Sequence, residues 1–452
     1  MRNILAIITL PLCFVGCNPH LQPATVSIPE RYIYATSSDS ITISSEWWTM
    51  FRDTTLNRLV SQALEANQNI AAAAARIEQA KANLKVARAA FLPNFTLGRS
   101  AGISGNGSVK QQYIVEPAVS WEIPLFGSLR ATTAQASAEV EYAKWQYSGV
   151  QLALSAEVAT TYFTLLQYRT NLDIAIESSR LRKETATLTD SLFVRGMASG
   201  VNREQALNLL YTSQADIPNY ERAVRQTLLS LDILLGKTPD STAYITTSAR
   251  LIDDYIPFDI PAGVPSDILY RRPDVISSYM NVLSAAASAK LARIARFPTF
   301  TLTGDGGFIS DDITELFTAG SVNWSALLSM TQPLYNFKGL KAREQSTVEA
   351  YNEAVANYRQ SFLEAVKDVE SALVSISAYR EQTARYKELV RSNAKIAMMT
   401  SALYDNGLTA YLDVIDAQRN LYNSRLQYSN IVAQQYINYI NLCKALGGGF
   451  KP

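Results

Sequence analysis

Four short segments of the chain alternate apolar and polar residues. The clearest lies between Tyr113 and Ile123, and the second lies between Val322 and Met330. Phe300 and Leu302 alternate with threonines in a third segment, and Phe95, Leu97 and Ile103 give a weaker fourth. Alternation over about ten residues is the signature of a membrane strand with one face in lipid. A soluble sheet of two hairpins would show the same pattern, so both interpretations stay open at this point.

Between and after these segments the chain predicts very long helices. No proline interrupts Leu125 to Ile217 or Leu334 to Lys451, and apolar residues recur there at spacings of three and four. Lys341 to Asn406 predicts a helix about 100 Å long at 1.5 Å per residue. We expect the chain to turn at Gly407 and to return as a second helix from Tyr411 to Leu446.

The chain repeats itself at a constant offset of 211 residues. Leu192 to Gly196 matches Leu403 to Gly407, and both halves end in a Leu-Gly pair. Each unit is predicted to run helix, strand, turn, strand, long helix, turn, long helix, so one structural unit is used twice. The predicted order begins with a signal peptide at 1–16 and an extended segment at 17–55. A first repeat at 56–237 follows, with strands at about 95–123 and a helical tip at 196–200. After an equatorial connection at 238–263 comes a second repeat at 264–447, with strands at about 300–331 and a tip at 407–410, and then a tail at 448–452.

The N-terminus predicts export and a lipid anchor. A basic start precedes an apolar run from Ile4 to Gly16, which is too short to span a bilayer but fits a signal peptide. The run ends in Phe14-Val15-Gly16-Cys17, which is similar to a bacterial lipobox, so we expect Cys17 to carry the lipid. The alternative is an ordinary secretory signal with an incidental cysteine. With Cys13 removed and Cys17 acylated, Cys443 has no disulfide partner and is predicted to be a small buried residue.

Composition argues against enzymes and nucleic-acid-binding proteins. The 41 basic residues balance 40 acidic ones, and the single histidine, His20, rules out Ser-His-Asp triads and sites with several histidines. We therefore expect no enzymatic activity, cofactor, metal or nucleic-acid partner. No segment is apolar for long enough to be a membrane helix, so strands must make any crossing. Four strands cannot close a barrel: two copies would give about eight strands with a filled interior, three about twelve with room for water.

The order of several motifs resembles the TolC-type outer-membrane factors, in their lipoprotein branch that serves resistance-nodulation-division efflux pumps. The resemblance begins at Trp47-Trp48, includes Trp121 to Gly127, and is most specific between Val264 and Val275. It closes with Tyr404-x-x-Gly407-x-x-x-Tyr411-Leu412-Asp413-Val414-Ile415-Asp416. One departure is Pro124, where the family usually has aspartate. The segment Arg271-Arg272-Pro273-Asp274 could suggest an anion site, but we interpret it as a helix start.

The resemblance implies a mostly α-helical protein with membrane β-structure. Three copies would form a 12-stranded β-barrel in the outer membrane that continues into a long periplasmic α-helical barrel. Its partners would be outer-membrane lipid, a periplasmic adaptor (membrane fusion protein) and an inner-membrane pump. Drugs, metabolites or ions would pass through unchanged. The alternatives are a type I secretion duct of the same architecture and a lipid-anchored periplasmic coiled-coil protein.

The resemblance also implies a gate at the two helical tips, near Gly196, Gly200 and Gly407. Asp413 and Asp416 match family positions that build acidic rings, and Tyr404 matches a gate residue. The repeat makes Asn202, Gln205 and Phe193 their counterparts. Three copies would gather six carboxylates around a narrow bore, which attracts cations and raises some carboxyl pKa values. The alternative is that Asp413 and Asp416 only decorate a solvated helix face.

Overall fold

The computed structural model describes residues 21–35, 44–105, 109–239, 251 and 265–450. The predicted signal peptide, the lipid anchor at Cys17 and almost all of the 238–263 connection lie outside these residues. Among the described helices, none is both long and apolar enough to cross a membrane. The chain forms two compact units, each assembled from three separate segments.

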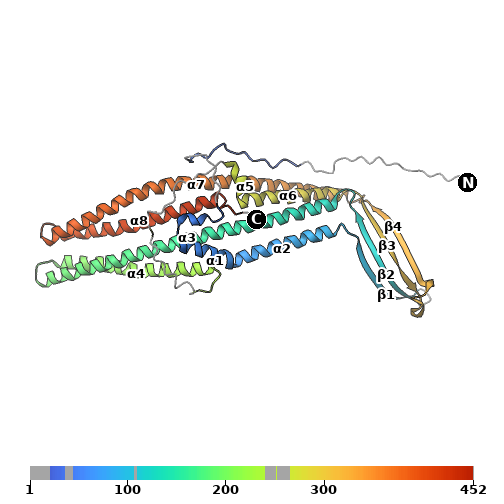
Figure 1. Cartoon of the computed structure of the whole chain (residues 1–452), viewed down its shortest axis with the longest axis horizontal. Helices are drawn as coiled ribbons and strands as arrows, with labels where there is room; N and C mark the ends of the chain where they lie inside the picture. The colour runs from blue at the N-terminus through green and yellow to red at the C-terminus, as the bar shows by residue number, and fades with distance from the viewer. Residues whose placement is uncertain (1–20, 36–43, 106–108, 240–250, 252–264, 451–452) are drawn as a thin grey trace. The chain divides into compact units, whose positions relative to one another are not determined.

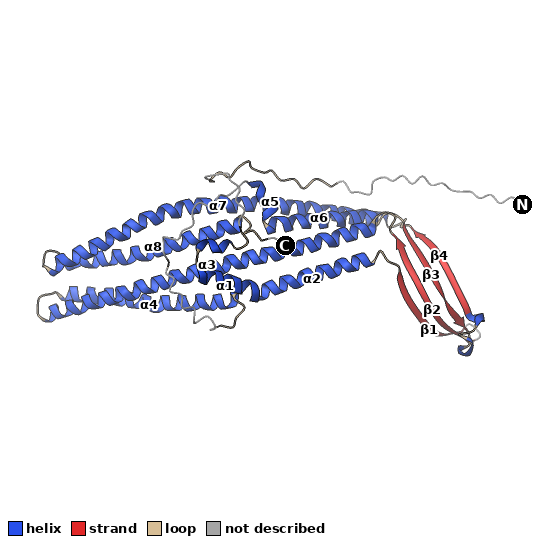
Figure 2. Ribbon diagram, viewed as in Figure 1, coloured by secondary structure: helices blue, strands red, loops and turns tan. Residues whose placement is uncertain are grey.

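One unit contains a four-stranded antiparallel sheet with the order β1-β2-β3-β4 (Figure 2). The strands are β1 (Asn94–Gly105), β2 (Val109–Ile123), β3 (Thr299–Ser310) and β4 (Val322–Thr331). The two hairpins lie far apart in the sequence and pair through β2 and β3, where Trp121 lies opposite Leu302. The prediction of four strands is confirmed. Strand β2 starts earlier than the alternation predicts, at Val109.

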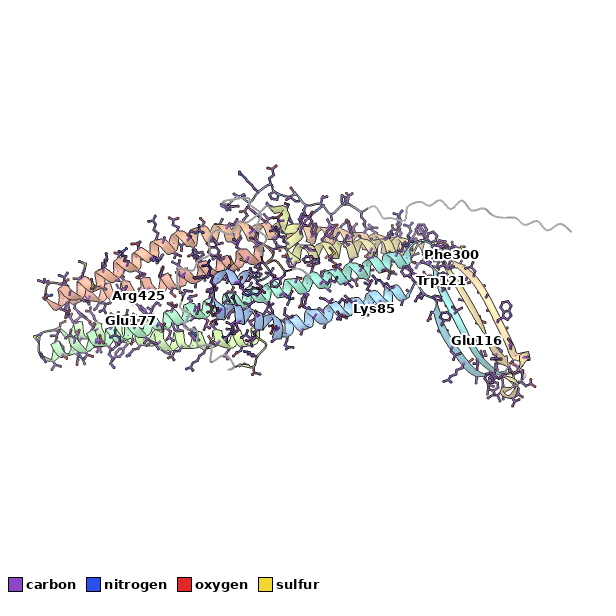
Figure 3. The ribbon with its side chains drawn as sticks, viewed as in Figure 1. Lys85, Glu116, Trp121, Glu177, Phe300 and Arg425 are labelled. Atoms are coloured by element: carbon purple, nitrogen blue, oxygen red, sulfur yellow. The ribbon has the colours of Figure 1, made fainter. Side chains whose placement is uncertain are left out.

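The register of the sheet gives it one apolar and one polar face, because side chains alternate along each strand. Trp121 and Phe300 are on the apolar face, near one end of the sheet (Figure 3), and Glu116 is on the polar face. The apolar face carries Phe95, Leu97, Tyr113, Val115, Val119, Trp121, Ile123, Phe300, Leu302, Phe308, Val322, Trp324, Leu328 and Met330. The polar face includes Glu116, Ser120, Glu122, Thr301, Thr303, Asp305 and Ser325. Strands β1 and β4 are free edges in this chain.

The other unit contains most of two helical hairpins. The first hairpin consists of α3 (Ser128–Val194) and α4 (Gly200–Leu234), and the second of α7 (Phe337–Asp405) and α8 (Tyr411–Ala445). The part of α3 from Trp145 and the part of α7 from Ser361 belong to this unit. In this unit the hairpins lie side by side with both turns at the same end (Figure 1). Helix α7 has 69 residues, which is about 100 Å at 1.5 Å per residue.

Aromatic rings fill the centre of this unit. Phe163 of α3 stacks on Tyr436 of α8 with ring centroids 4.4 Å apart, and the ring centroid of Phe51 lies 5.1 Å from that of Phe163.

The cysteine near the end of α8 is buried, as predicted. Cys443 is 1% exposed, and burial raises the pKa of its thiol to about 12. The short 3-10 helices are Trp47–Phe51, Pro265–Asp267, Ile313–Glu315 and Ala319–Ser321.

The single leading helix expected in each repeat is two helices instead. Asn67 separates α1 (Thr54–Ala66) from α2 (Gln68–Ala89), and Arg272 separates α5 (Ile268–Arg271) from α6 (Pro273–Ile294). Each of these side chains donates a hydrogen bond to the end of the repeat's last helix. Asn67 Nδ2 lies 2.8 Å from the Leu234 carbonyl, and Arg272 Nη1 lies 3.3 Å from the Ala445 carbonyl. Because the helix is interrupted at Asn67 and at Arg272, each side chain can reach a carbonyl at the end of the repeat's last helix. A contact over such a distance in the sequence is not visible in any local pattern.

A glycine completes the same junction in each repeat. Gly236 has φ +67° and Gly447 has φ +91°. A Cβ on Gly236 would lie 2.3 Å from the Ala66 carbonyl oxygen, and a Cβ on Gly447 would lie 2.6 Å from the Arg271 carbonyl oxygen. These distances are far below a normal contact, so the two Leu-Gly pairs mark places where only glycine lets the backbones meet.

Arg272 is the charged centre of the second junction. It is 8% exposed and bonds to Asp274 of α6 at 2.6 Å and to Asp368 of α7 at 3.2 Å. Burial by itself would raise the pKa of Asp274, but the hydrogen bonds and charge of Arg272 outweigh it and lower that pKa. Helix α6 begins at Pro273, with Asp274 in its first turn, so the prediction of a helix start is confirmed.

Candidate functional site

The turns at the two helical tips have the same backbone geometry. Gly196 and Gly407 have φ +73° and +72°, and each N–H bonds to the carbonyl three residues earlier at 2.9 Å. The next residue bonds five residues back in both turns, Met197 to Leu192 at 2.8 Å and Leu408 to Leu403 at 2.9 Å. This is a Schellman motif, which ends a helix through a left-handed glycine. Gly200 is the first residue of α4.

Near the first tip, Arg203 of α4 contacts two residues of α3, one charged and one aromatic. Its Nε lies 2.6 Å from Asp190 Oδ1, and its guanidinium lies 5.6 Å from the centre of the Phe193 ring. Phe193 is 41% exposed. Asn202 and Gln205 are half-buried, and neither side-chain amide has a hydrogen-bond partner among the described residues. The motifs did not indicate Arg203, although it lies thirteen residues after Asp190, on the other arm of the predicted hairpin.

Around the second tip, both predicted carboxylates make local contacts. Asp413 is exposed and accepts a hydrogen bond from the Thr409 hydroxyl. Asp416 Oδ1 lies 2.8 Å from Arg419 Nη2, and both side chains are about half exposed. Both contacts are local to the second hairpin, so they fit a residue that lines a gate as well as a residue on a solvated helix face. Arg419 lies three residues after Asp416 on the same helix face and therefore partly balances its charge.

Tyr404 belongs to an apolar cluster that joins the two hairpins. Its ring centroid lies 5.2 Å from that of Tyr411, which is 4% exposed. Burial raises the pKa of both tyrosines. The buried members of the cluster are Ala186, Ala206, Leu210, Tyr411, Val414 and Ile415. Tyr404 therefore borders the cluster that joins the hairpins, although its ring contact with Tyr411 is within its own hairpin, as is the contact of its repeat counterpart Phe193 with Arg203.

Farther from the tips, Arg182, Asp216 and Tyr422 form what we call the inter-hairpin clamp. The Tyr422 hydroxyl donates to Asp216 Oδ2 at 2.7 Å, and the Arg182 guanidinium carbon lies 4.7 Å from the centre of the Tyr422 ring. Arg182 also donates to the Leu209 carbonyl at 3.1 Å. The clamp thus joins α3, α4 and α8.

Burial shapes the ionisation of the clamp. It raises the pKa of Tyr422, as does the neighbouring Asp216 carboxylate, and it lowers the pKa of Arg182. Nearby, Glu177 of α3 faces Arg425 of α8 at 3.7 Å (Figure 3). Sequence reasoning missed the clamp, although Tyr422 is one of the matching residues of the repeat.

Removing the clamp hydroxyl is expected to loosen the tips. Tyr422→Phe deletes a hydrogen bond to a carboxylate, worth about 1.5–3 kcal/mol. Amide hydrogen exchange in the tip-proximal turns of α4 and α8 should then be about tenfold faster or more.

Tyr211 provides the matched control for this experiment. It occupies the equivalent position of the first repeat but is 60% exposed, against 6% for Tyr422. Tyr211→Phe should leave exchange unchanged. Equal exchange rates in both variants would show that the clamp contributes nothing to tip stability.

Comparisons with known proteins agree with this architecture. The model of the outer membrane efflux protein family matches residues 59–237 and 264–448. The chain is 30% identical over 411 residues to the solvent efflux pump outer membrane protein SrpC of Pseudomonas putida, covering 88% of this chain and 86% of that protein. It is 28% identical over 466 residues to the probable outer membrane lipoprotein SilC of Salmonella typhimurium, covering 100% and 98%.

The fold is also that of a solved channel. The Campylobacter jejuni CmeC outer membrane channel superposes with a TM-score of 0.91 at 24% identity, covering 96% of this chain and 95% of that one. The two matched segments of the family model confirm the predicted internal duplication. The resemblance predicted from the motifs is therefore confirmed, and the chain belongs to the outer membrane efflux protein family.

Proposed function

We propose that the chain forms, as a homotrimer, the outer-membrane exit duct of a tripartite efflux pump. The observation that carries this proposal is the four-stranded sheet, with one apolar face, one polar face and two free edges. A sheet in lipid must have no free edge. Three copies supply twelve strands, which close into a barrel wide enough for water, with the polar face turned to the lumen.

Location and cargo follow from the relatives. SrpC is named as a solvent efflux protein and SilC as an outer membrane lipoprotein, which supports an outer-membrane location and an acylated Cys17 for this chain. Hydrophobic drugs, solvents, metabolites or ions are the expected cargo. They pass down their gradient without covalent change, so the protein is no enzyme. A periplasmic adaptor and an inner-membrane pump deliver them.

The helical tips are proposed as the gate of the duct. Asp413 and Asp416 supply the charge, Tyr404 borders the cluster that joins the hairpins, and Phe193, Asn202 and Gln205 line the corresponding positions of the first tip. The inter-hairpin clamp supports this role, because it connects α8 to α3 and α4 a few helical turns away from the tips. Opening then requires the two hairpins to separate at these contacts.

The decisive test measures conductance and mass on one sample of purified protein. In planar lipid bilayers we expect discrete channel openings from a species of about three times the 49.8 kDa chain, less the signal peptide. A protein that stays monomeric in detergent and never conducts would overturn the proposal in favour of a lipid-anchored periplasmic coiled-coil protein.

A further inference from the structure

The helices that adjoin the sheet carry a concentration of positive charge beside it. Helices α2, α3, α6 and α7 connect to the four strands through four or five residues each, and the register puts all four connections at the same end of the sheet. Nine cations and one carboxylate, Glu344, lie in these connections or in the eight helix residues next to them. The nine cations, which we call the basic belt, are Lys85, Arg88, Arg130, Lys290, Arg293, Arg296, Lys338, Lys341 and Arg343. Figure 3 shows Lys85 on the part of α2 toward the sheet, and the whole belt belongs to the unit that contains the sheet.

The belt does not follow from the overall composition, because the whole chain has a net charge of only +1. The hairpin connections at the opposite end of the sheet carry Asp311, Asp312 and Glu315 against one cation, Lys110. The sheet therefore separates a strongly basic end from a mildly acidic end. Cations that gather beside a membrane segment are attracted to anionic lipid headgroups.

Helix stability does not explain the belt either. The helix dipole favours cations at the C-terminal ends of α2 and α6, but α3 and α7 begin at the sheet, and there the dipole opposes them. Neither α3 nor α7 has an acidic residue in its first turn. Lys338 and Lys341 are three residues apart at the start of α7, so they also repel each other. An anion from outside the chain would compensate both costs.

Most of the belt has no ionic partner within the part of the chain that the structure describes. Arg296 pairs with Glu344, and its guanidinium carbon lies 4.5 Å from the centre of the Phe337 ring. Six other cations make no hydrogen bond or ion pair with any described residue, and all but Lys290 of these are exposed. The six are Arg88, Arg130, Lys290, Lys338, Lys341 and Arg343. Their donors are therefore available to a ligand.

One pair of the belt lies on the side of the unit that carries the N-terminal segment. Arg130 of α3 and Lys290 of α6 line one groove, and Leu21 lines the same groove. Leu21 comes four residues after Cys17, the predicted lipid-bearing cysteine, and four extended residues reach at most about 14 Å. Acyl chains on Cys17 would insert into the bilayer and not into a water-filled bore. This pair therefore lies on the bilayer side of the duct.

We propose that the basic belt binds the headgroups of anionic phospholipids, with Arg130 and Lys290 as one headgroup site. This inference rests on the proposed outer-membrane duct. Guanidinium and ammonium groups donate charge-assisted hydrogen bonds to the phosphate oxygens. The acyl chains then lie along the apolar face of the sheet, where Trp121 and Phe300 mark the end next to the belt (Figure 3). Aromatic side chains at this level are typical of the boundary between headgroups and acyl chains. The belt therefore sets the depth and the direction of the barrel in the bilayer.

Quenching of Trp121 fluorescence by brominated lipids measures which lipids surround the belt. The protein is reconstituted into vesicles of phosphatidylcholine and phosphatidylglycerol, with the bromine on one lipid or the other. Trp324→Phe removes the other tryptophan of the apolar face; Trp47 and Trp48 are buried, and Trp145 lies 17 residues into α3. We expect Trp121 to prefer phosphatidylglycerol over phosphatidylcholine at least about fivefold, the attraction expected from one cation or more at a headgroup surface. The preference should fall as the salt concentration is raised.

Charge variants of the same reporter protein test the belt itself. Arg130→Gln with Lys290→Gln should reduce the preference severalfold, and adding Lys338→Gln and Lys341→Gln should abolish it. Exchanging the pair, Arg130→Lys with Lys290→Arg, keeps the charge and should keep the preference. The matched control is Arg391→Gln with Lys395→Gln, which removes two exposed cations from the tip half of α7 and should change nothing.

The outcomes separate this inference from the function on which it rests. If the variant that lacks all four cations has the same lipid preference as the unaltered protein, the belt does not bind headgroups, although trimers that conduct still support the duct. If that variant keeps the preference but loses efflux in cells, the cations serve a protein partner and the proposal is wrong. If the unaltered protein neither trimerises nor conducts, the proposed function itself fails.

Discussion

Replacing Asp413 and Asp416 together by alanine is expected to raise the single-channel conductance of the resting protein severalfold and to weaken its preference for cations. Two carboxylates from each of three copies would surround the bore at the tips. They contribute a ring of negative charge, and Asp413 also holds Thr409 of the turn. Without them the ring no longer concentrates cations, and the first turn of α8 loses a contact that fixes the tip.

A control variant removes two negative charges from the same hairpin at a distance from the tip. Glu381 and Glu388 are exposed on α7, well before the turn, and Glu381→Ala with Glu388→Ala should leave conductance and selectivity unchanged. Recordings in planar bilayers at matched salt compare the two double variants. An unchanged conductance and selectivity in the Asp413/Asp416 variant would return these residues to a solvated helix face.

Replacing Gly236 by alanine is expected to destabilise the helical unit by more than about 3 kcal/mol. Two costs combine at this position. The left-handed backbone, with φ +67°, disfavours any residue with a Cβ by about 1–2 kcal/mol. In addition, the new Cβ would lie 2.3 Å from the Ala66 carbonyl oxygen, so α1 and the end of α4 must move apart. That movement also weakens the hydrogen bond from Asn67 to Leu234.

Gly196 separates these two costs. It has φ +73°, but a Cβ there meets nothing within 4 Å. Gly196→Ala should therefore cost only the backbone strain, about 1–2 kcal/mol. Thermal unfolding followed by circular dichroism should show a clearly larger drop in midpoint for Gly236→Ala. Equal midpoints would mean that the junction between α1 and α4 relaxes freely and that the short contact carries no stability.

Much of the fold could be predicted because its signals are local and long. The alternation between Tyr113 and Ile123 directly reports a strand with two different faces, and the absence of proline over Leu334 to Lys451 leaves few alternatives to a helical hairpin. The start of a helix at Pro273, directly after Arg272, was predicted from the proline, and Asn67 caps α2 by accepting a hydrogen bond from the Asn69 N–H. The long-range contacts were not predictable, because each side chain binds a carbonyl more than 160 residues away.

The site divides in the same way. The turns at Gly196 and Gly407 could be located from the repeat, because a left-handed residue after a long helix favours glycine. The partner of Asp416 could also be predicted, because Arg419 lies three residues later on the same helix face. The contact of Tyr404 with Tyr411 could not, because it depends on how α7 and α8 pack across the turn.

The sequence by itself determined the four strands, the two helical hairpins, the duplication and the family, because these depend on periodicity and on glycine and proline placement. Only the tertiary structure decided how the two copies of the repeat differ. Tyr211 and Tyr422 occupy equivalent positions, yet one is exposed and the other is buried against Arg182 and Asp216. Equivalent residues in a duplicated chain meet different neighbours, and those neighbours decide which copy holds the hairpins together.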